Sequence, residues 1–163
     1  MTAVRIGHGF DVHRFSAEPE PPLVLGGVVF DDVPRLVGHS DGDVIAHAVT
    51  DALLGAAGLG DIGEHFPDTD PSLRDANSME LLRRATDAVR ANGWAPRNVD
   101  CTVVLETPKI APCRAAIEAC LAEAVGAPVT VKGKRAEGLG ALGRSEGVAC
   151  FAVALLTPRG APA

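Results

Sequence analysis

The sequence is poor in aromatic residues and contains no cluster of basic residues. Only 4% of its 163 residues are aromatic, and the formal net charge is −6 at pH 7. Proteins that bind nucleic acid use basic surfaces and aromatic side chains on which bases stack. We therefore expect no nucleic-acid partner. An anionic small substrate is still compatible with this charge, because a metal ion or a helix N-terminus supplies a local positive field.

Long apolar runs and closely paired cysteines are also missing. No run approaches the roughly 20 apolar residues of a membrane-spanning helix, so we expect no membrane association. The four cysteines, Cys101, Cys113, Cys120 and Cys150, form no Cys-x-x-Cys pair, and no secretory leader opens the sequence. These features predict a reduced, cytoplasmic protein without a cysteine-based metal site.

Length and hydrophobic periodicity predict one domain, residues 1–163, in which strands alternate with helices. Strands are expected at 4–15, 99–105, 129–132 and 148–156, with two extended segments around a glycine bend at 23–30. Helices are expected at 43–57, 78–91 and 112–126, and a surface loop at 58–71. This order favours an α+β fold, an α/β sandwich with a mixed sheet, helices on one face and at least one antiparallel strand pair.

Two common nucleotide-binding motifs do not fit the sequence. Residues 138–143 spell Gly-x-Gly-x-x-Gly, but a β-like segment follows them instead of a helix, and no acidic residue lies about 20 positions later. The sequence also lacks a Gly-x-x-x-x-Gly-Lys-Ser/Thr motif. Rossmann and P-loop nucleotide sites are therefore excluded.

The strongest indication of chemistry is a set of three metal-ligand residues. Asp11 and His13 are two positions apart on an extended segment, so their side chains project to the same side. His47 lies in the expected helix 43–57, with Asp43 and Asp51 four residues away on either side. Two imidazoles and one carboxylate leave one tetrahedral position open, as in a catalytic zinc site. The alternative is that three unrelated polar residues occupy these positions.

The segment that enters this helix, His-Ser-Asp-Gly-Asp at 39–43, has two compatible interpretations. Its backbone N–H groups and the helix dipole suit an anion such as a phosphate, which His39 would also contact. Ser40 additionally fits the role of the helix N-cap, which needs no ligand.

Six motifs spread over nearly the whole chain agree with one pattern. They are Gly-His-Gly-Phe-Asp-Val-His at 7–13, His-Ser-Asp-Gly-Asp at 39–43, Gly-Asp-Ile-Gly at 60–63, Phe-Pro-Asp-Thr-Asp at 66–70, Pro-Lys at 108–109 and Gly-Arg-Ser-Glu-Gly at 143–147. In this order and spacing they resemble the 2-C-methyl-D-erythritol 2,4-cyclodiphosphate synthase family.

The resemblance implies an enzyme of the non-mevalonate isoprenoid pathway. Members of this family convert 4-diphosphocytidyl-2-C-methyl-D-erythritol 2-phosphate into the cyclic diphosphate and release CMP, by attack of the substrate's 2-phosphate on its own β-phosphorus. The resemblance also implies a four-stranded sheet in a chorismate-mutase-like trimer core, a small N-terminal hairpin, and a homotrimer with active sites at subunit interfaces.

Matching the motifs position by position implies a set of site residues. Asp11, His13 and His47 would bind Zn²⁺, Glu137 would bind Mg²⁺ or Mn²⁺, and His39 and Arg135 would be catalytic. The cytidine diphosphate-linked substrate would contact Asp11, Val12, His13, His39, Ser40, Asp61, Ile62, Gly63, Phe66, Pro67, Asp68, Thr69, Asp70, Leu105, Glu106, Thr107, Pro108, Lys109, Ile110, Ala111, Lys134, Arg135, Ala136, Glu137, Ala141 and Arg144.

Two positions depart from the family pattern. Arg135 stands where the family commonly has a threonine whose hydroxyl contacts phosphate, and Ala141 stands where a phenylalanine often lines a cavity near the threefold axis. Arg144 keeps the family type and is expected either to bind phosphate or to pair with Glu146.

Two other functions fit the metal-ligand residues taken alone. A zinc-dependent phosphoester hydrolase would use a metal-bound hydroxide in the open position. A binding or assembly module would use the ion only to tie the first strand to the helix.

Overall fold

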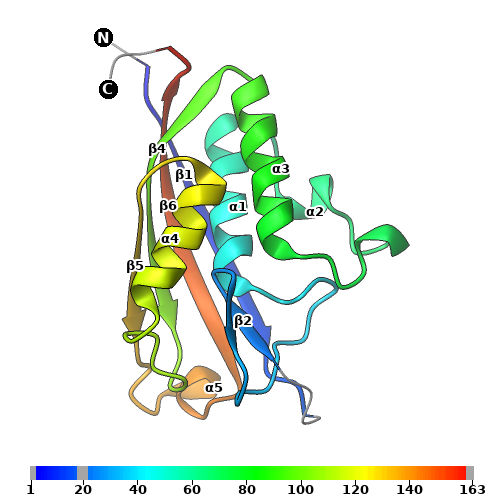
Figure 1. Ribbon diagram of the computed structural model, residues 1–163, viewed down its shortest axis with the longest axis vertical. Coiled ribbons are helices and arrows are strands. Elements are labelled where there is room, and N and C mark those ends of the chain that lie inside the picture. The colour runs from blue at the N-terminus through cyan, green and yellow to red at the C-terminus, as the bar shows by residue number, and fades with distance from the viewer. Residues whose placement is uncertain (1–2, 18–21, 161–163) are drawn as a thin grey trace.

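The computed structural model describes residues 3–17 and 22–160 and has a four-stranded mixed sheet (Figure 1). The strands lie in the order β1 (Arg5–Arg14), β6 (Gly147–Pro158), β4 (Trp94–Val104) and β5 (Val129–Lys134). β6 is antiparallel to both of its neighbours, whereas β4 and β5 are parallel. The mixed sheet and the antiparallel last strand expected from the sequence are confirmed.

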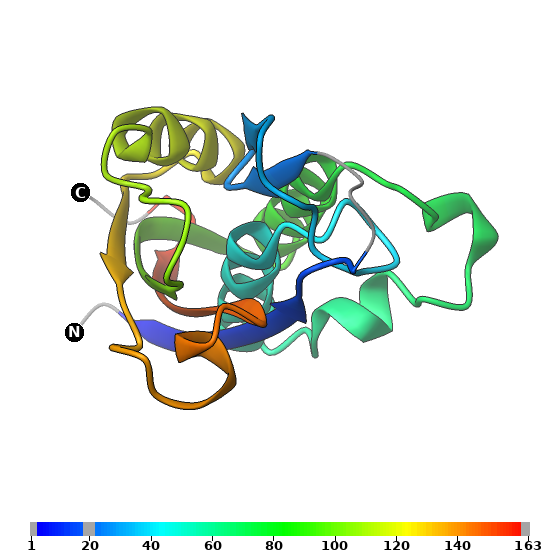
Figure 2. The same ribbon diagram turned by 90° about the horizontal axis from the view of Figure 1, so that it is seen from below.

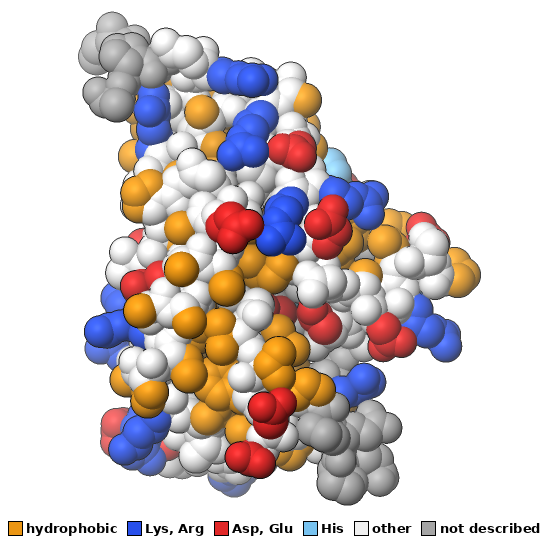
Figure 3. Space-filling view, viewed as in Figure 1, with side chains coloured by type: hydrophobic (Ala, Val, Ile, Leu, Met, Phe, Trp, Pro, Cys, Tyr) orange, Lys and Arg blue, Asp and Glu red, His pale blue; other side chains and the backbone are white. Residues whose placement is uncertain are grey.

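Three helices cover one face of the sheet, as Figure 2 shows from below: α1 (Val44–Ala57), α3 (Ser78–Ala91) and α4 (Arg114–Val125). The core between helices and sheet is apolar, with Leu53, Leu82 and Leu121 on the helices fully buried against Val103 and Ala152 on the strands. Burial of this surface supplies most of the favourable free energy of folding. On the helical side, apolar side chains cluster around β2, between scattered charged groups (Figure 3).

The opposite face of the sheet carries exposed apolar side chains. Because neighbouring strand residues point to opposite faces, Ile6, Phe10 and Val12 of β1 face away from the helices, as do Phe151 and Val153 of β6. These five side chains are 43–70% exposed. The Phe10 and Phe151 rings lie side by side, with centroids 4.9 Å apart.

Short elements fill the connections. β2 (Leu23–Leu25) and β3 (Val28–Phe30) form an antiparallel pair, and α5 (Gly140–Gly143) is one turn long and leads into β6. The expected loop at 58–71 is wrong in part, because it contains α2 (Ile62–His65) and the start of a 3₁₀ helix, η1 (Pro71–Leu73). Carboxylates explain both: Asp61 caps α2 and Asp70 caps η1.

Several element boundaries differ from the sequence-based expectation, three of them in ways that the pairing or the turns explain. β4 begins at Trp94 and not at residue 99, because the long β6 pairs with it as far as Pro158. β5 continues to Lys134, beyond residue 132, along the same parallel partner. α4 begins at Arg114 and not at Pro112, since Cys113 still belongs to a turn in which its N–H donates to Ile110 O. No helix among the described residues is long and apolar enough to cross a membrane.

Candidate metal centre

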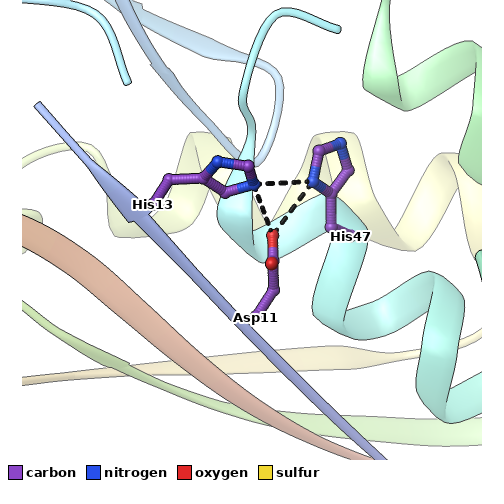
Figure 4. A group of neighbouring side chains, drawn as sticks. All are labelled: Asp11, His13 and His47. Carbon is purple, nitrogen blue, oxygen red and sulfur yellow. Dashed lines mark hydrogen bonds and ion pairs between the residues drawn. The ribbon is translucent and has the colours of Figure 1, made fainter. Parts of the chain in front are cut away.

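Strand β1 and helix α1 pack close enough to bring three ligand side chains together. Gly7 and Gly9 face the helix, and a Cβ atom at either position would lie about 2.0 Å or less from a carbonyl oxygen of α1. Only glycine permits this approach of the two backbones. Asp11 and His13 continue on the same side of β1 and therefore meet His47 near the start of α1 (Figure 4).

The three side chains converge on one point. Asp11 Oδ2 lies 2.9 Å from both His13 Nε2 and His47 Nδ1, and the two nitrogens are 3.2 Å apart. Tetrahedral zinc with bonds of about 2.0–2.1 Å would separate its ligand atoms by about 3.3 Å, so these atoms are nearly in place. Two nitrogens and one oxygen suit a divalent transition metal better than magnesium. Within residues 3–17 and 22–160, no other group of His, Cys, Asp and Glu side chains converges in this way.

The outer nitrogen of each imidazole is also held. His13 Nδ1 is 2.6 Å from Val37 O, and His47 Nε2 is 2.8 Å from Ser78 Oγ. Such second contacts fix ring orientation in metal centres. Neither Val37 nor Ser78 was predicted from the sequence, because the first contributes only its backbone and the second lies 31 residues from His47.

Mutual contact shifts the pKa values of two ligands in opposite directions. Burial tends to raise the pKa of Asp11, but hydrogen bonds and charge attraction from His13 and His47 outweigh it and lower the pKa well below its usual range. Burial tends to lower the pKa of His13, but its hydrogen bond to Asp11 and the charge of that carboxylate raise it above the usual value. The site therefore favours positive charge beside Asp11.

Asp43, not Ser40, caps α1. Its buried carboxylate accepts N–H bonds from Ile45 and Ala46 in the helix and from Gly26 and Gly27 in the β2–β3 turn, at 2.7–3.2 Å. The capping role expected for Ser40 is therefore wrong. The Asp43 carboxylate occupies the N–H groups of Ile45 and Ala46, so these two groups do not bind a phosphate. The anion expected at 39–43, with His39 as a contact, stays a prediction.

Asp51, four residues after His47, also accepts a hydrogen bond within the fold. Its Oδ1 accepts a hydrogen bond from Ile62 N at 2.8 Å, which ties α1 to the start of α2. Burial raises the pKa of this carboxyl group. The acidic residues that flank His47 thus hold neighbouring segments in place and are not further metal ligands.

A cavity of about 460 Å³ opens beside the triad. The expected site residues that line it are Asp11, His13, His39, Ser40, His47, Ile62, Gly63, Phe66, Pro67 and Asp68. Leu73 and Leu81 complete the wall and were missed, because a cavity wall and a core position carry the same apolar signal. Asp61, Thr69 and Asp70 lie in the same segment but do not line the cavity, and Val12 points to the open face of the sheet.

A second cavity, of about 160 Å³, lies where β4 and β5 end. Its expected lining residues are Leu105, Glu106, Pro108, Lys109, Ile110, Ala111, Lys134 and Arg135, and it adds Arg114 and Gly133. Arg135 Nη2 is 2.7 Å from Glu106 Oε2, and this contact lowers the pKa of Glu106. The two cavities share no lining residue. The β5 end and α2 lie on opposite sides of the molecule in Figures 1 and 2.

A model of the YgbB family matches residues 4–157. The chain belongs to this family. A relative from Bordetella petrii named 2-C-methyl-D-erythritol 2,4-cyclodiphosphate synthase is 56% identical over 155 residues, which cover 93% of this chain and 94% of the relative. The family resemblance inferred from the motifs is confirmed.

Solved structures of the family agree in fold. A bifunctional protein from Campylobacter jejuni, titled IspDF, matches with a TM-score of 0.91 and 43% identity over 97% of this chain, which spans only 43% of that longer protein. A Plasmodium falciparum protein, titled IspF in a CDP complex, matches with a TM-score of 0.83 and 36% identity, covering 97% of this chain and 98% of that one.

The remaining residues implied by the family pattern line neither cavity: Thr107, Ala136, Glu137, Ala141 and Arg144. Glu137 is exposed, adopts a left-handed backbone conformation with φ of 52°, and does not join the triad. Arg144 Nε lies 2.6 Å from Glu146 Oε1, which is the pairing that the sequence left open.

Proposed function

We propose that the chain cyclises 4-diphosphocytidyl-2-C-methyl-D-erythritol 2-phosphate to 2-C-methyl-D-erythritol 2,4-cyclodiphosphate and releases CMP, in the non-mevalonate isoprenoid pathway. The main support is that Asp11, His13 and His47 converge beside a cavity of about 460 Å³. In addition, the chain is 56% identical to a relative named 2-C-methyl-D-erythritol 2,4-cyclodiphosphate synthase. An oxygen of the 2-phosphate bonds to the β-phosphorus as the bond from that phosphorus to CMP breaks, so no water is consumed.

Zn²⁺ is the ion that we propose for the triad, because the ligand set suits it and leaves one position for substrate. When bound, it withdraws electron density from a phosphate oxygen and makes the phosphorus more electrophilic. His39 lines the same cavity and would bind phosphate beside it. We retain Mg²⁺ or Mn²⁺ at Glu137 as part of the proposal, because an exposed carboxylate suits such hard cations.

The segment from Asp61 to Asp70 would hold the methylerythritol phosphate end of the substrate. Ile62, Gly63 and Asp68 line the cavity, while the Phe66 ring lies 4.9 Å below the guanidinium carbon of Arg84 on α3. This cation–π contact braces the segment against a helix.

The second cavity would hold the cytidine diphosphate part. A family member from Plasmodium falciparum has been solved with CDP, and this cavity offers four cationic side chains, Lys109, Arg114, Lys134 and Arg135, against one carboxylate. This excess of positive charge favours binding of an anionic diphosphate group. Catalytic participation by Arg135 therefore requires the two cavities to meet.

A homotrimer with active sites at subunit interfaces would let them meet. One chain keeps the cavities apart, and the apolar side chains on the open face of β1 and β6 are an exposed patch of the kind that subunits bury, as in a chorismate-mutase-like trimer core. Mixing inactive His47→Ala chains with chains in which all four cations of the second cavity are replaced by alanine tests this. We expect the mixed oligomers to regain activity. A fully active protein that light scattering shows to be a monomer would contradict the shared site.

Two further parts of the proposal concern the domain organisation and the location of the protein. The match of one family model to residues 4–157 supports a single domain. The four free cysteines support a reducing, cytoplasmic location.

The phosphoester hydrolase and the metal-stabilised module find no support among the relatives. Incubation of the enzyme with the cytidyl substrate in ¹⁸O-labelled water separates cyclisation from hydrolysis. We expect CMP and an unlabelled cyclic diphosphate in equal amounts. Label in either product would overturn the proposal.

A further inference from the structure

The two imidazoles of the triad present different nitrogen atoms to Asp11. His13 uses Nε2 and His47 uses Nδ1. A neutral imidazole carries one proton, so one nitrogen can bind a metal only when the proton is on the other. Whatever contacts the outer nitrogen therefore decides whether the inner one has a free lone pair.

For His13 the outer contact is unambiguous. Nδ1 faces the carbonyl oxygen of Val37 at 2.6 Å, and a carbonyl can only accept. The backbone of Val37 is itself fixed, since its N–H donates to Arg14 O at 2.9 Å. Neutral His13 therefore carries its proton on Nδ1 and directs the Nε2 lone pair into the triad.

For His47 the outer contacts are hydroxyl groups, which can donate or accept. Nε2 lies 2.8 Å from Ser78 Oγ and 3.0 Å from Ser40 Oγ. A hydroxyl that donated to Nε2 would leave the ring proton on Nδ1, where the metal must bind. Ser78 by itself does not decide between the two states.

Asp41 decides it. The Ser78 hydroxyl contacts Asp41 Oδ1, and the Ser78 backbone N–H donates to Asp41 Oδ2 at 3.0 Å. A carboxylate only accepts, so the hydroxyl proton points to Asp41 and the Ser78 lone pairs face His47 Nε2 and the Ser40 hydroxyl. Ser40 Oγ lies 3.2 Å from Ser78 Oγ and is the donor of that bond, because the Ser78 proton is already directed at Asp41. Asp41 is held in turn, because its N–H donates to Ala76 O at 3.1 Å and its Oδ1 accepts from Asp43 N at 3.2 Å.

We propose that Asp41 and Ser78 are positioning residues of the metal centre. Through the chain Asp41–Ser78–His47 they keep the proton of His47 on Nε2 and direct its Nδ1 lone pair at the ion. The inference rests on the proposed function only in requiring that the triad binds a divalent cation. It assigns Asp41, which lies in the His-Ser-Asp-Gly-Asp segment, to the metal centre and not to a phosphate.

The test measures Zn²⁺ affinity in the absence of substrate, by competition with a chromogenic chelator. Loss of an outer partner of a histidine ligand lowers metal affinity about 10–100-fold, and we expect that loss for Ser78→Ala and for Asp41→Asn. Ser78→Thr keeps the hydroxyl and should restore the affinity. Thr86→Val is the matched control, because it removes another buried hydroxyl of α3, bonded only locally to Leu82 O at 2.8 Å.

Ser78→Ala should fold, since Asn77 caps α3 and the backbone N–H of residue 78 still reaches Asp41. Co²⁺ in place of Zn²⁺ gives a second readout: the visible absorption bands should shift in Ser78→Ala and not in Thr86→Val. Equal Zn²⁺ affinity and equal Co²⁺ spectra in wild type and Ser78→Ala would overturn the inference. If Ser78→Ala binds Zn²⁺ more weakly than wild type as expected, but wild type releases no CMP from the cytidyl substrate, the inference is supported and the proposed function is overturned.

Discussion

The two cavities differ in how completely one chain fixes their polar groups. In the first, the side chains of Asp11, His13 and His47 are only 12–24% exposed, and both imidazoles are bonded on their outer side. In the second, the Arg135 side chain is 63% exposed and reaches Glu106 from the end of a strand. The polar groups of the metal centre are thus held by contacts within one chain, whereas we expect the second cavity to take its final form with nucleotide and a neighbouring subunit.

The largest effect is expected from a change at Asp43, whose carboxylate joins the start of α1 to the β2–β3 turn beside the first cavity. Asp43→Ala would leave N–H groups of Gly26, Gly27, Ile45 and Ala46 without their acceptor. Each buried donor left unpaired costs about 1–3 kcal/mol, and the costs overlap, so we expect a loss of about 3–5 kcal/mol in the free energy of unfolding. Urea titration followed by circular dichroism measures it. Asp87→Ala, a change at an exposed acidic residue of α3, should leave the midpoint nearly unchanged.

The next largest effect is expected at a ligand itself. Apparent binding free energies of about 10–16 kcal/mol for structural zinc with four ligands suggest that one ligand contributes about 2.5–4 kcal/mol. His47→Ala should therefore weaken Zn²⁺ binding about 100–1,000-fold and abolish CMP release, while α1 persists because alanine is the better helix former. Metal analysis and circular dichroism check the two halves. Undiminished zinc content would contradict the assignment of the triad.

Metal uptake should also depend on pH, in a direction set by His13. Its raised pKa means that the proton on His13 stabilises the metal-free fold fully below the unfolded value, and this contribution disappears as pH rises through the folded pKa. The metal must displace that proton, so Zn²⁺ affinity should rise with pH by up to about tenfold per unit and then level off. Chelator competition over a pH series measures the slope. A flat profile through the neutral range would contradict the link between Asp11 and His13.

The ligands of the first cavity were predictable because each follows from local periodicity. Alternation along β1 places Asp11 and His13 on one side, and Gly7 and Gly9 lie on that same side, a signal in the sequence that α1 packs closely there. The supporting contacts were not predictable in this way. Asp43 meets Gly26 and His47 meets Ser78 only after separate elements dock, at separations of 17 and 31 residues.

The fold was predictable to a similar depth. The spans of α1 and α3 follow from helical spacing of apolar residues and match the structure almost residue for residue. The early start of β4 was missed, because Pro96 is a poor strand former and its pairing with β6 depends on a register shift between Pro96 and Asn98. In the homotrimer that we propose, the second cavity would meet the first through contacts between chains, which no periodicity within one chain encodes.

The smallest effect is expected in the second cavity, and a matched pair of arginines isolates it. Arg135 and Arg144 are both 63% exposed and both paired with a glutamate, but only Arg135 lines the cavity. The Arg144–Glu146 pair is exposed on both sides and contributes little, so Arg144→Thr should leave the melting temperature nearly unchanged. Arg135→Thr removes a partner of Glu106, whose side chain is only 8% exposed, and should lower the melting temperature slightly. Arg135→Thr should weaken CDP binding up to about fivefold, because three other cations share the field, and Arg144→Thr should not. Calorimetric titration with CDP separates the two variants. If Arg135→Thr weakened CDP binding as much as His47→Ala is expected to weaken Zn²⁺ binding, Arg135 would be as important to its cavity as a metal ligand is to the triad. The difference proposed between the two cavities would then be wrong.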